Sequence, residues 1–198
     1  MCVQIEPLPR DLIDEVIQEV RAGRAINLMP DWPAVRPSAF PGSKVGLIVG
    51  EGGCMAPAIK QWGYRRPWSK SLIVNTRDDS ALDPSKMWFE SLMNRRCVIP
   101  VFGFFEPHRT EASISPRTGK PIKQQYLFTT PASPVTFIAG IYEGDCFSMM
   151  TTAPNATMMP IHDRMPLVLL QNELERWLCG DYRALFDRSA IKLDATRA

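Results

Sequence analysis

Apolar positions near the start of the chain recur with the period of an α-helix. Between Asp11 and Arg21 they fall on one stripe, formed by Leu12, Ile13, Val16, Ile17 and Val20. Gly23 follows soon after, and glycine is the residue that most often ends a helix. The pattern predicts an amphipathic helix over residues 11–21 that packs on a sheet.

Two later segments also carry helix signals. Asp83 precedes Pro84, and an acidic cap followed by proline is typical of a helix start. Apolar positions then continue to about Met93. A further run, from Gln171 to Leu178, stops before a glycine. We therefore expect helices over residues 84–93 and 171–178.

Short apolar or alternating runs, divided by Gly, Pro, Asn and Asp, fill most of the remaining chain. They predict strands at 44–49, 71–74, 97–105, 125–128, 135–142, 146–152 and 167–170. The turn residues 143–145 separate two of these runs, which is typical of a hairpin. With 18 prolines and no regular alternation of strands and helices, the sequence predicts an α+β fold. We expect a single domain over residues 1–198, with a mainly antiparallel, barrel-like sheet and flanking helices.

Composition narrows the class of protein. The 198 residues are 45% hydrophobic, which is enough to form the core of one domain. No apolar run approaches the roughly 20 residues of a membrane span, and no secretion signal is visible, so we expect a cytoplasmic protein without a membrane partner. The five cysteines are an odd number without a CxxC pair, which argues against a disulfide framework and a zinc site. We expect no metal, no cofactor and a monomer.

The net charge of +2 is too small to indicate a nucleic-acid-binding protein by itself. Basic residues nevertheless gather at Arg65, Arg66 and Lys70, and aromatic residues at positions 62, 64 and 68 are interleaved with them. Aromatic rings among cations suit single-stranded nucleic acid, because bases stack on the rings and phosphates pair with the cations. A solvated basic face is the alternative explanation.

Cys2 directly follows the initiator Met1. Removal of Met1 would leave a free α-amine and a thiol on the same residue. Such a 1,2-aminothiol traps aldehydes, because the amine forms a Schiff base and the thiol then closes a five-membered thiazolidine ring. Both groups titrate near neutrality, the amine around 7.7–8.0 and the thiol around 8.5. The alternative is that Cys2 is a small apolar residue on a first strand.

Four polar residues interrupt apolar strands or lie at strand ends, where a rigid scaffold often presents chemistry. They are Asn75, Arg77, Glu106 and His162. Glu106 follows two phenylalanines, and desolvation there should raise the pKa of its carboxyl toward the range of a general acid or base. Each residue also has a structural explanation: the glutamate can pair with an arginine, the asparagine can close a turn, and the histidine can be a core imidazole.

Six motifs along the chain occur in an order that resembles the SRAP family, the SOS response-associated peptidase fold. After Met1-Cys2 come 62–64 with Pro67-Trp68, Asn75–Arg77, 96–100 with 103–106, 139–143, and Thr151-Thr152 with Asn155 and 160–166. The last segment, Pro-Ile-His-Asp-Arg-Met-Pro, is the most specific. The resemblance implies a single α+β domain that recognises abasic sites in single-stranded DNA. It also implies a DNA–protein crosslink through the N-terminal cysteine, formed as part of the DNA damage response.

By matching position, the resemblance makes Cys2 the nucleophile, through both its amine and its thiol. Asn75 would hold the amine or the opened sugar. Glu106 would be the general acid and base that opens the sugar ring and dehydrates the carbinolamine. His162 would stabilise the sugar hydroxyl and assist proton transfer, including reversal.

The resemblance also implies DNA contacts. Arg77 would clamp a phosphate, and Trp68 and Pro41 would support the bases that flank the lesion. Arg164 would be another DNA contact, although an arginine next to an aspartate can equally form a structural ion pair. Thr151 would donate a hydrogen bond to a sugar or phosphate.

The chain departs from the family pattern at several positions. Val3-Gln4 stands where the family usually has Gly-Arg, and Pro37-Ser38 where it commonly has Tyr-Asn. Pro107 replaces the usual Trp after the glutamate, and the chain ends at Ala198 without the family's C-terminal Pro-Val-Ser region. Valine is stiffer and bulkier than glycine, which affects the pose of the cysteine. Such divergence would fit a phage-borne copy.

Two other function classes remain open. A thiol peptidase or autoprotease that uses Cys2 would also need a neighbouring base and an amide. A non-catalytic module that binds single-stranded DNA would keep the groove without the reaction, and its binding would depend on Arg77 and not on Cys2. A covalent adduct on the N-terminal peptide distinguishes crosslinking from both alternatives.

Overall fold

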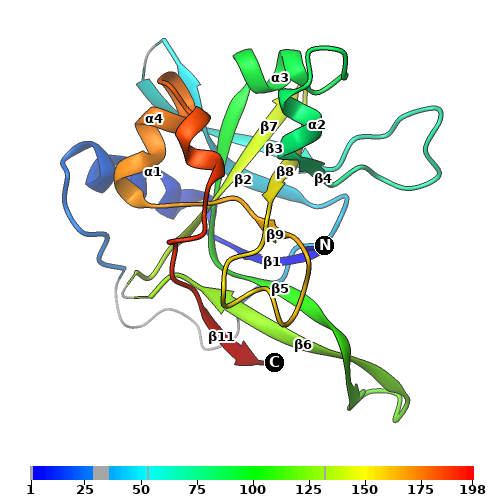
Figure 1. Cartoon of the computed structure of the whole chain (residues 1–198). Coiled ribbons are helices and arrows are strands. Elements are labelled where there is room, and N and C mark those ends of the chain that lie inside the picture. The colour runs from blue at the N-terminus through cyan, green and yellow to red at the C-terminus, as the bar shows by residue number, and fades with distance from the viewer. Residues whose placement is uncertain (1, 29–35, 53, 132) are drawn as a thin grey trace.

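The computed structural model describes residues 2–28, 36–52, 54–131 and 133–198. Its centre is one mixed sheet in which five strands close into a ring (Figure 1). The ring strands are β2 (Lys44–Glu51), β3 (Cys54–Trp62), β5 (Arg96–Ile114), β7 (Thr136–Glu143) and β8 (Cys146–Thr152). Going round the ring, β7 pairs with β8, β8 with β3, β3 with β2, β2 with β5, and β5 again with β7.

Six further strands extend this ring. They are β1 (Gln4–Pro7), β4 (Asn75–Arg77), β6 (Pro121–Thr129), β9 (Met165–Pro166), β10 (Val168–Leu169) and β11 (Asp194–Arg197). β1 and β6 pair with β5, and β11 pairs with β6; β4 and β9 pair with β8, and β10 with β7. All pairings are antiparallel except β3–β8 and β4–β8. The predicted α+β fold with a mainly antiparallel, barrel-like sheet is therefore confirmed.

Helices flank the ring, as predicted. They are α1 (Arg10–Arg21), α2 (Asp78–Leu82), α3 (Phe89–Asn94) and α4 (Leu174–Cys179), with the 3-10 turns η1 (Gln171–Glu173) and η2 (Arg183–Phe186). The apolar stripe of α1 is buried, which confirms the predicted helix. The helix predicted over 171–178 is present as η1 followed by α4. None of the described helices is both long and apolar enough to cross a membrane.

The helix predicted to start at Pro84 is wrong at its N-terminal end. The Asp83 carboxylate accepts a hydrogen bond from the Ser85 backbone N–H at 2.9 Å, so it closes a local turn. Residues 84–88 remain a turn, and α3 begins only at Phe89. A short helix, α2, occurs instead just before this turn.

Three strand predictions also need correction. β3 was not expected, because Pro57, Lys60 and Gln61 break its apolar pattern. Proline is tolerated there because β3 pairs with β8 only at its last two residues, 61 and 62. The strand expected at 71–74 occurs instead at Asn75–Arg77. β5 continues to Ile114, so Glu106 lies within a strand and not at its end.

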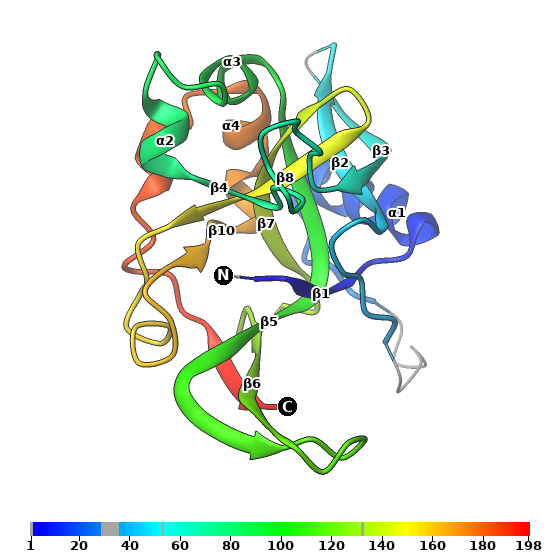
Figure 2. The same ribbon diagram turned by 90° about the vertical axis from the view of Figure 1, so that its right-hand side faces the viewer.

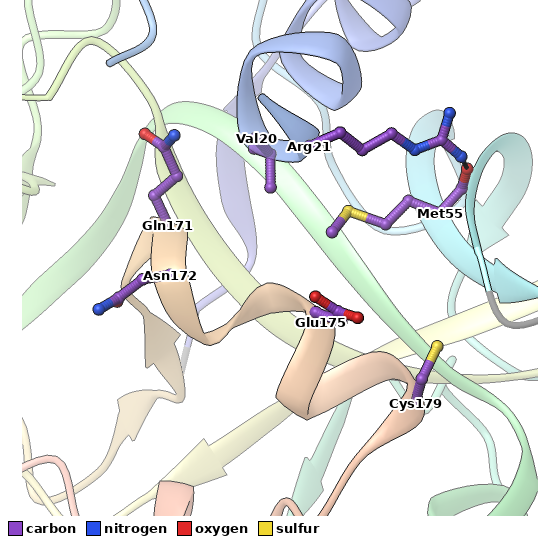
Figure 3. A pocket seen from close by; sticks show the side chains of 7 residues that line it. All are labelled: Val20, Arg21, Met55, Gln171, Asn172, Glu175 and Cys179. Carbon is purple, nitrogen blue, oxygen red and sulfur yellow. Dashed lines mark hydrogen bonds between the residues drawn. The ribbon is translucent and has the colours of Figure 1, made fainter. Parts of the chain in front are cut away.

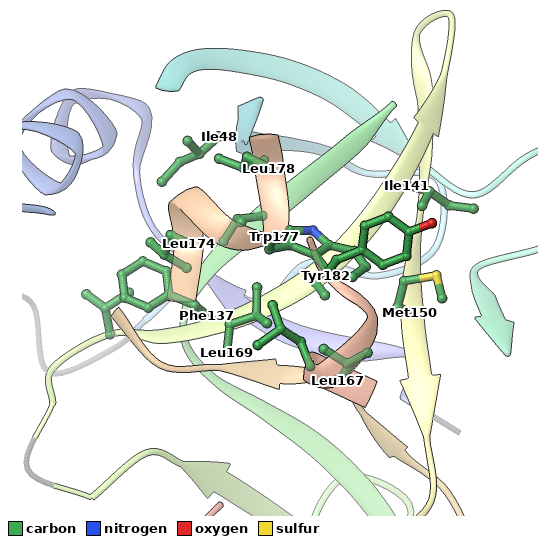
Figure 4. Packing of buried hydrophobic residues seen from close by; sticks show 14 of the residues in the cluster. Ile48, Phe137, Ile141, Met150, Leu167, Leu169, Leu174, Trp177, Leu178 and Tyr182 are labelled. Carbon is green, nitrogen blue, oxygen red and sulfur yellow. The ribbon is translucent and has the colours of Figure 1, made fainter. Parts of the chain in front are cut away.

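The hydrophobic core has two parts. The first lies between the ring and the helices, where Trp177 and Tyr182 pack with residues of β7 and β10 (Figure 4). The second lies on the other face of the β5 region and includes Cys2, Phe104 and Phe128. Cys2 is therefore a member of the second core cluster, next to β5.

The β5–β6 hairpin projects away from the ring in both ribbon views (Figures 1 and 2). Gly103 permits this pairing, because a Cβ there would lie 2.7 Å from the Leu127 side chain and 2.8 Å from the Phe128 carbonyl oxygen. Close packing at the base of the hairpin fixes the backbone direction just before Glu106.

Candidate functional site

Four parts of the chain meet at the candidate site: the start of β1, β4, the middle of β5, and the turn before β9. The β1–β5 register places Gln4 opposite Phe105 and Ile5 opposite Phe104, so Cys2 lies beside the next residues of β5. The start of the chain lies between β4 and β5 in Figure 2. Met1, whose removal the sequence predicts, lies outside the described residues.

Asn75 and Cys2 are in direct contact. The Asn75 Nδ2 donates a hydrogen bond to the Cys2 carbonyl oxygen at 2.9 Å. The Asn75 Oδ1 is buried and has no hydrogen-bond partner within the described part of the chain. One end of this amide therefore holds the backbone of the predicted nucleophile, and the other end is buried without a partner among the described residues.

The Cys2 thiol is fully buried, and its Sγ donates a hydrogen bond to the Gln4 carbonyl oxygen at 3.3 Å. Burial raises the pKa of this thiol, and the negative charge of Glu106 raises it further. The thiol is therefore protonated near neutral pH in the unprocessed chain. The effect of Glu106 also means that the carboxyl lies close to the sulfur.

Glu106 is 1% exposed, and burial raises the pKa of its carboxyl to about 7. The positive charge of the amino terminus and the nearby Cys2 backbone N–H lower this pKa, whereas Asp163 raises it. A carboxyl that titrates near neutrality can both give and take a proton at the pH of the cell. The pKa shift expected from its apolar neighbours is present.

His162 lies in the turn that precedes β9. Its Nδ1 is 2.9 Å from the Asp163 Oδ1 and 3.1 Å from the Arg164 backbone N–H, which donates to it. Burial lowers the pKa of the imidazole, and the positive charges of the amino terminus and of Arg109 lower it further. Asp163 raises the pKa of both His162 and Glu106, so the two groups lie within reach of one carboxylate.

The sequence did not identify Asp163 as part of this cluster. Its charge acts on Glu106, His162 and Arg77. The only sequence signal for it was its position next to His162, because neighbours in a tight turn share an environment. Asp163 is therefore an electrostatic component of the candidate site.

Three predicted DNA contacts lie on the surface. The Trp68 side chain is 68% exposed, and Pro41 is exposed next to Phe40, which is 50% exposed. Arg77 is also exposed, but its guanidinium is paired with Asp79 through two hydrogen bonds, of which the Nε–Oδ1 bond is 3.0 Å long. A ligand phosphate would have to displace Asp79 from Arg77.

Arg164 and Thr151 are held inside the structure. The Arg164 guanidinium donates hydrogen bonds to the Asp78 Oδ1 and to the Thr151 carbonyl oxygen, both at 2.6 Å. The Arg164 side chain is 16% exposed, and Thr151 is 1% exposed. This geometry corresponds to the structural ion pair considered as the alternative for Arg164, because one guanidinium nitrogen binds both Asp78 and Thr151.

Two of the departures from the family pattern are in contact with each other. The Gln4 Nε2 donates a hydrogen bond to the Ser38 Oγ at 3.1 Å. Both residues lie next to the start of β1, because Ile5 and Ala39 form a backbone bridge. The two substitutions therefore form one polar contact at the edge of the site.

A separate pocket lies away from these residues (Figure 3). Its volume is about 360 Å³, and it is lined by Val20, Arg21, Met55, Gln171, Asn172, Glu175 and Cys179. None of the predicted catalytic or DNA-binding residues belongs to this lining. Within residues 2–28, 36–52, 54–131 and 133–198, no group of three or more His, Cys, Asp or Glu residues could hold a metal ion.

Sequence comparison finds relatives of this chain. The model of the SOS response associated peptidase (SRAP) family matches residues 13–192. The chain is 28% identical over 153 residues to the abasic site processing protein YoqW of Bacillus subtilis, which covers 70% of this chain and 64% of that protein. It is 28% identical over 152 residues to the abasic site processing protein YedK of Escherichia coli, covering 74% of this chain and 65% of YedK. The matched region thus spans less than two thirds of these relatives.

Solved structures share the fold. A protein of Bordetella bronchiseptica matches with a TM-score of 0.71 at 19% identity, over 100% of this chain and 99% of that one. A protein of Bacteroides thetaiotaomicron matches with a TM-score of 0.68 at 21% identity, over 99% and 91% of the two chains. With a family model that matches nearly the whole sequence, the chain belongs to the SOS response associated peptidase family.

Proposed function

We propose that this protein processes abasic sites in single-stranded DNA by forming a covalent crosslink to them through Cys2 after removal of Met1. Family membership and the names of the relatives YoqW and YedK support a role in abasic-site processing. The ring-opened sugar of an abasic site is an aldehyde, and a 1,2-aminothiol is a trap for aldehydes. The crosslink would shield a labile lesion.

One observation carries the proposal. The backbone N–H of Cys2 lies close enough to the Glu106 carboxyl to lower its pKa, which burial raises to about 7. Removal of Met1 turns that same nitrogen into the α-amine. The nucleophile and a carboxyl suited to proton transfer would therefore already be neighbours before DNA binds.

The first half of the reaction makes a Schiff base. The Cys2 amine adds to the aldehyde carbon of the sugar, and its proton passes to the former carbonyl oxygen to give a carbinolamine. Protonated Glu106 then gives its proton to the hydroxyl, which leaves as water while the carbon–nitrogen double bond forms. His162, whose pKa is lowered, is neutral at pH 7 and can hydrogen-bond a hydroxyl of the opened sugar.

The second half closes the ring. Glu106, now ionised, takes the proton of the Cys2 thiol, and the sulfur adds to the carbon of the Schiff base. The electron pair of the carbon–nitrogen double bond returns to the nitrogen, which keeps the proton it already carries, and Glu106 is left protonated as at the start. One water is lost overall, and no oxidant or reductant is needed. Asn75 would fix the Cys2 backbone throughout, through its hydrogen bond to the carbonyl oxygen.

The DNA strand would be held by the exposed residues near the site. Trp68 offers a free ring for stacking, and Arg65 and Lys70 beside it are exposed cations. Pro41 presents a rigid apolar surface on a different loop. Arg77 would clamp a phosphate once Asp79 is displaced.

The peptidase alternative has less support from this geometry. A thiol peptidase needs a thiolate, which is favoured by a lowered cysteine pKa. Burial and Glu106 both raise the pKa of the Cys2 thiol. The environment therefore suits a reaction that begins at nitrogen better than one that begins at sulfur.

The proposal is tested by incubating the processed protein with a single-stranded oligonucleotide that carries one abasic site. We expect a denaturant-stable adduct whose mass equals protein plus DNA minus one water, located on the N-terminal peptide. A tetrahydrofuran analogue of the abasic site, which cannot open to an aldehyde, should give no adduct, and neither should Cys2→Ala. Turnover of a peptide ester without any DNA adduct would favour the peptidase instead.

The role of the amine has its own test. A tag that cannot be removed from the N-terminus acylates the amine and should abolish adduct formation. The matched control carries the same tag at the C-terminus and should react normally. Full reaction of the N-terminally tagged protein would exclude ring closure through Cys2.

A further inference from the structure

Arg109 connects the strand that carries Glu106 with the turn that carries His162. It lies on β5, three residues after Glu106, in the first part of the projecting hairpin. Its backbone N–H donates a hydrogen bond to the Ile161 carbonyl oxygen at 3.1 Å, and its guanidinium donates one to the Met159 carbonyl oxygen at 2.9 Å. Both acceptors belong to the turn that immediately precedes His162.

We propose that Arg109 is a positioning residue, which fixes the turn that carries His162 to the strand that carries Glu106. The Arg109 guanidinium is exposed and has no carboxylate partner within the described part of the chain, so its contact to the turn is not part of an ion pair. The opposite side of the turn is held separately, because Asn155 accepts a hydrogen bond from the Met158 N–H at 2.9 Å and donates one to the Ile191 carbonyl oxygen at 2.7 Å.

The electrostatic effect of Arg109 on His162 supports its positioning role. Burial is the largest cause of the lowered pKa of the His162 imidazole; the amino terminus and Arg109 lower this pKa further, whereas Asp163 and the Arg164 backbone N–H raise it. The Nδ1 atom of the ring lies 3.1 Å from the Arg164 backbone nitrogen and 2.9 Å from the Asp163 Oδ1. Arg109 therefore helps to keep the imidazole neutral in addition to holding its backbone.

The test uses Arg109→Ala, Arg109→Lys and, as a matched control, Arg117→Ala, which removes a cation from the tip of the same hairpin. The pKa of His162 is followed by NMR in the free protein, where the two histidines of the chain are assigned with a His108→Gln variant. Arg109→Ala should raise the pKa of His162, because a positive charge is lost. Arg109→Lys should leave it near the wild-type value, and so should the control.

The rate of crosslinking is the second measurement. Its interpretation rests on the proposed function. Arg109→Ala should slow adduct formation roughly fivefold, which corresponds to the loss of about one hydrogen bond. Arg109→Lys should recover part of this rate, and Arg117→Ala should match the wild type. If Arg109→Ala does not fold, Arg109→Gln removes the same charge and is expected to behave alike.

A failure of the proposed function can be distinguished from a failure of the role proposed for Arg109. If the wild type forms no adduct, the proposed function fails, whereas the NMR titration still decides the role of Arg109. If Arg109→Ala and Arg117→Ala have the same His162 titration and the same crosslinking rate, the positioning role is refuted.

Discussion

Replacing Glu106 by glutamine should make the protein more stable at alkaline pH. The pKa of this carboxyl is about 7 against an ordinary value of 4.5, because it is buried. Each pKa unit corresponds to about 1.4 kcal/mol, so ionising Glu106 in the folded protein costs about 3 kcal/mol. Glutamine has nearly the same shape and never ionises, and it should remove this cost.

The pH range of the effect follows from the direction of the pKa shift. The folded protein binds the Glu106 proton more tightly than the unfolded chain does. Stability from this group is therefore complete below pH 4.5 and is lost as the pH rises through about 7. Glu106→Gln and wild type should have similar unfolding free energies near pH 4, and the variant should be more stable by about 3 kcal/mol at pH 8.

Urea unfolding of both proteins at several pH values between 4 and 8 measures this difference. His162 titrates in both proteins, so its contribution cancels. Glu106→Asp is the control, because it keeps a carboxyl at the site and should retain the pH dependence. Parallel stability curves for wild type and Glu106→Gln would refute the argument that this carboxyl is destabilised by burial.

Crosslinking should respond to the same substitution in a separate way. Glu106→Gln removes the proton donor and acceptor and should slow adduct formation roughly a hundredfold or more, while the affinity for an unreactive oligonucleotide stays nearly unchanged. The wild-type rate should depend on a group that titrates around 7, and the variant should lose this dependence and keep only that of the α-amine, which titrates around 7.7–8.0. Identical rate profiles would contradict the acid/base role.

Two further predictions concern the arginines. Asp79→Asn should free Arg77 and strengthen binding to single-stranded DNA up to about fivefold, because an exposed ion pair is worth about 0–1 kcal/mol. Weaker binding of the variant in fluorescence anisotropy would refute this prediction. Arg164→Ala should cost about 3 kcal/mol of unfolding free energy, because it leaves the mostly buried Asp78 carboxylate without a cation. Arg77→Ala should lower the unfolding free energy by less than about 1 kcal/mol, because the ion pair of Arg77 is exposed. A smaller loss of stability for Arg164→Ala than for Arg77→Ala in urea unfolding would contradict the structural role of Arg164.

The periodicity of apolar residues correctly predicted the helices and strands in which the choice of residue depends mainly on burial. The stripe of α1 and the continuous apolar run of β7 are both recovered, because their buried faces pack against the core. β3 was missed because it pairs on one side for most of its length, and such a strand tolerates proline and polar residues. The helix start at Asp83 was wrong because a carboxylate can close a turn as well as cap a helix.

The candidate site was predicted unevenly, for physical reasons. Cys2, Asn75, Glu106 and His162 were named from motifs and from chemistry that each residue carries alone. Asp163 was not, because its effect depends on distances to groups from three different parts of the chain. Electrostatic interactions between residues far apart in the sequence cannot be read from local sequence patterns. They become visible only in the folded structure.

The protonation states in the site determine the order of bond formation in the proposed reaction. Burial and Glu106 raise the pKa of the Cys2 thiol, so the sulfur is neutral near pH 7 and is a poor nucleophile. The α-amine titrates around 7.7–8.0, so a fraction of it is neutral and reactive at the same pH. Loss of water from the carbinolamine then leaves Glu106 ionised beside the thiol. The base that ring closure requires is thus created by the preceding step, and for this reason nitrogen must bond to the sugar before sulfur does.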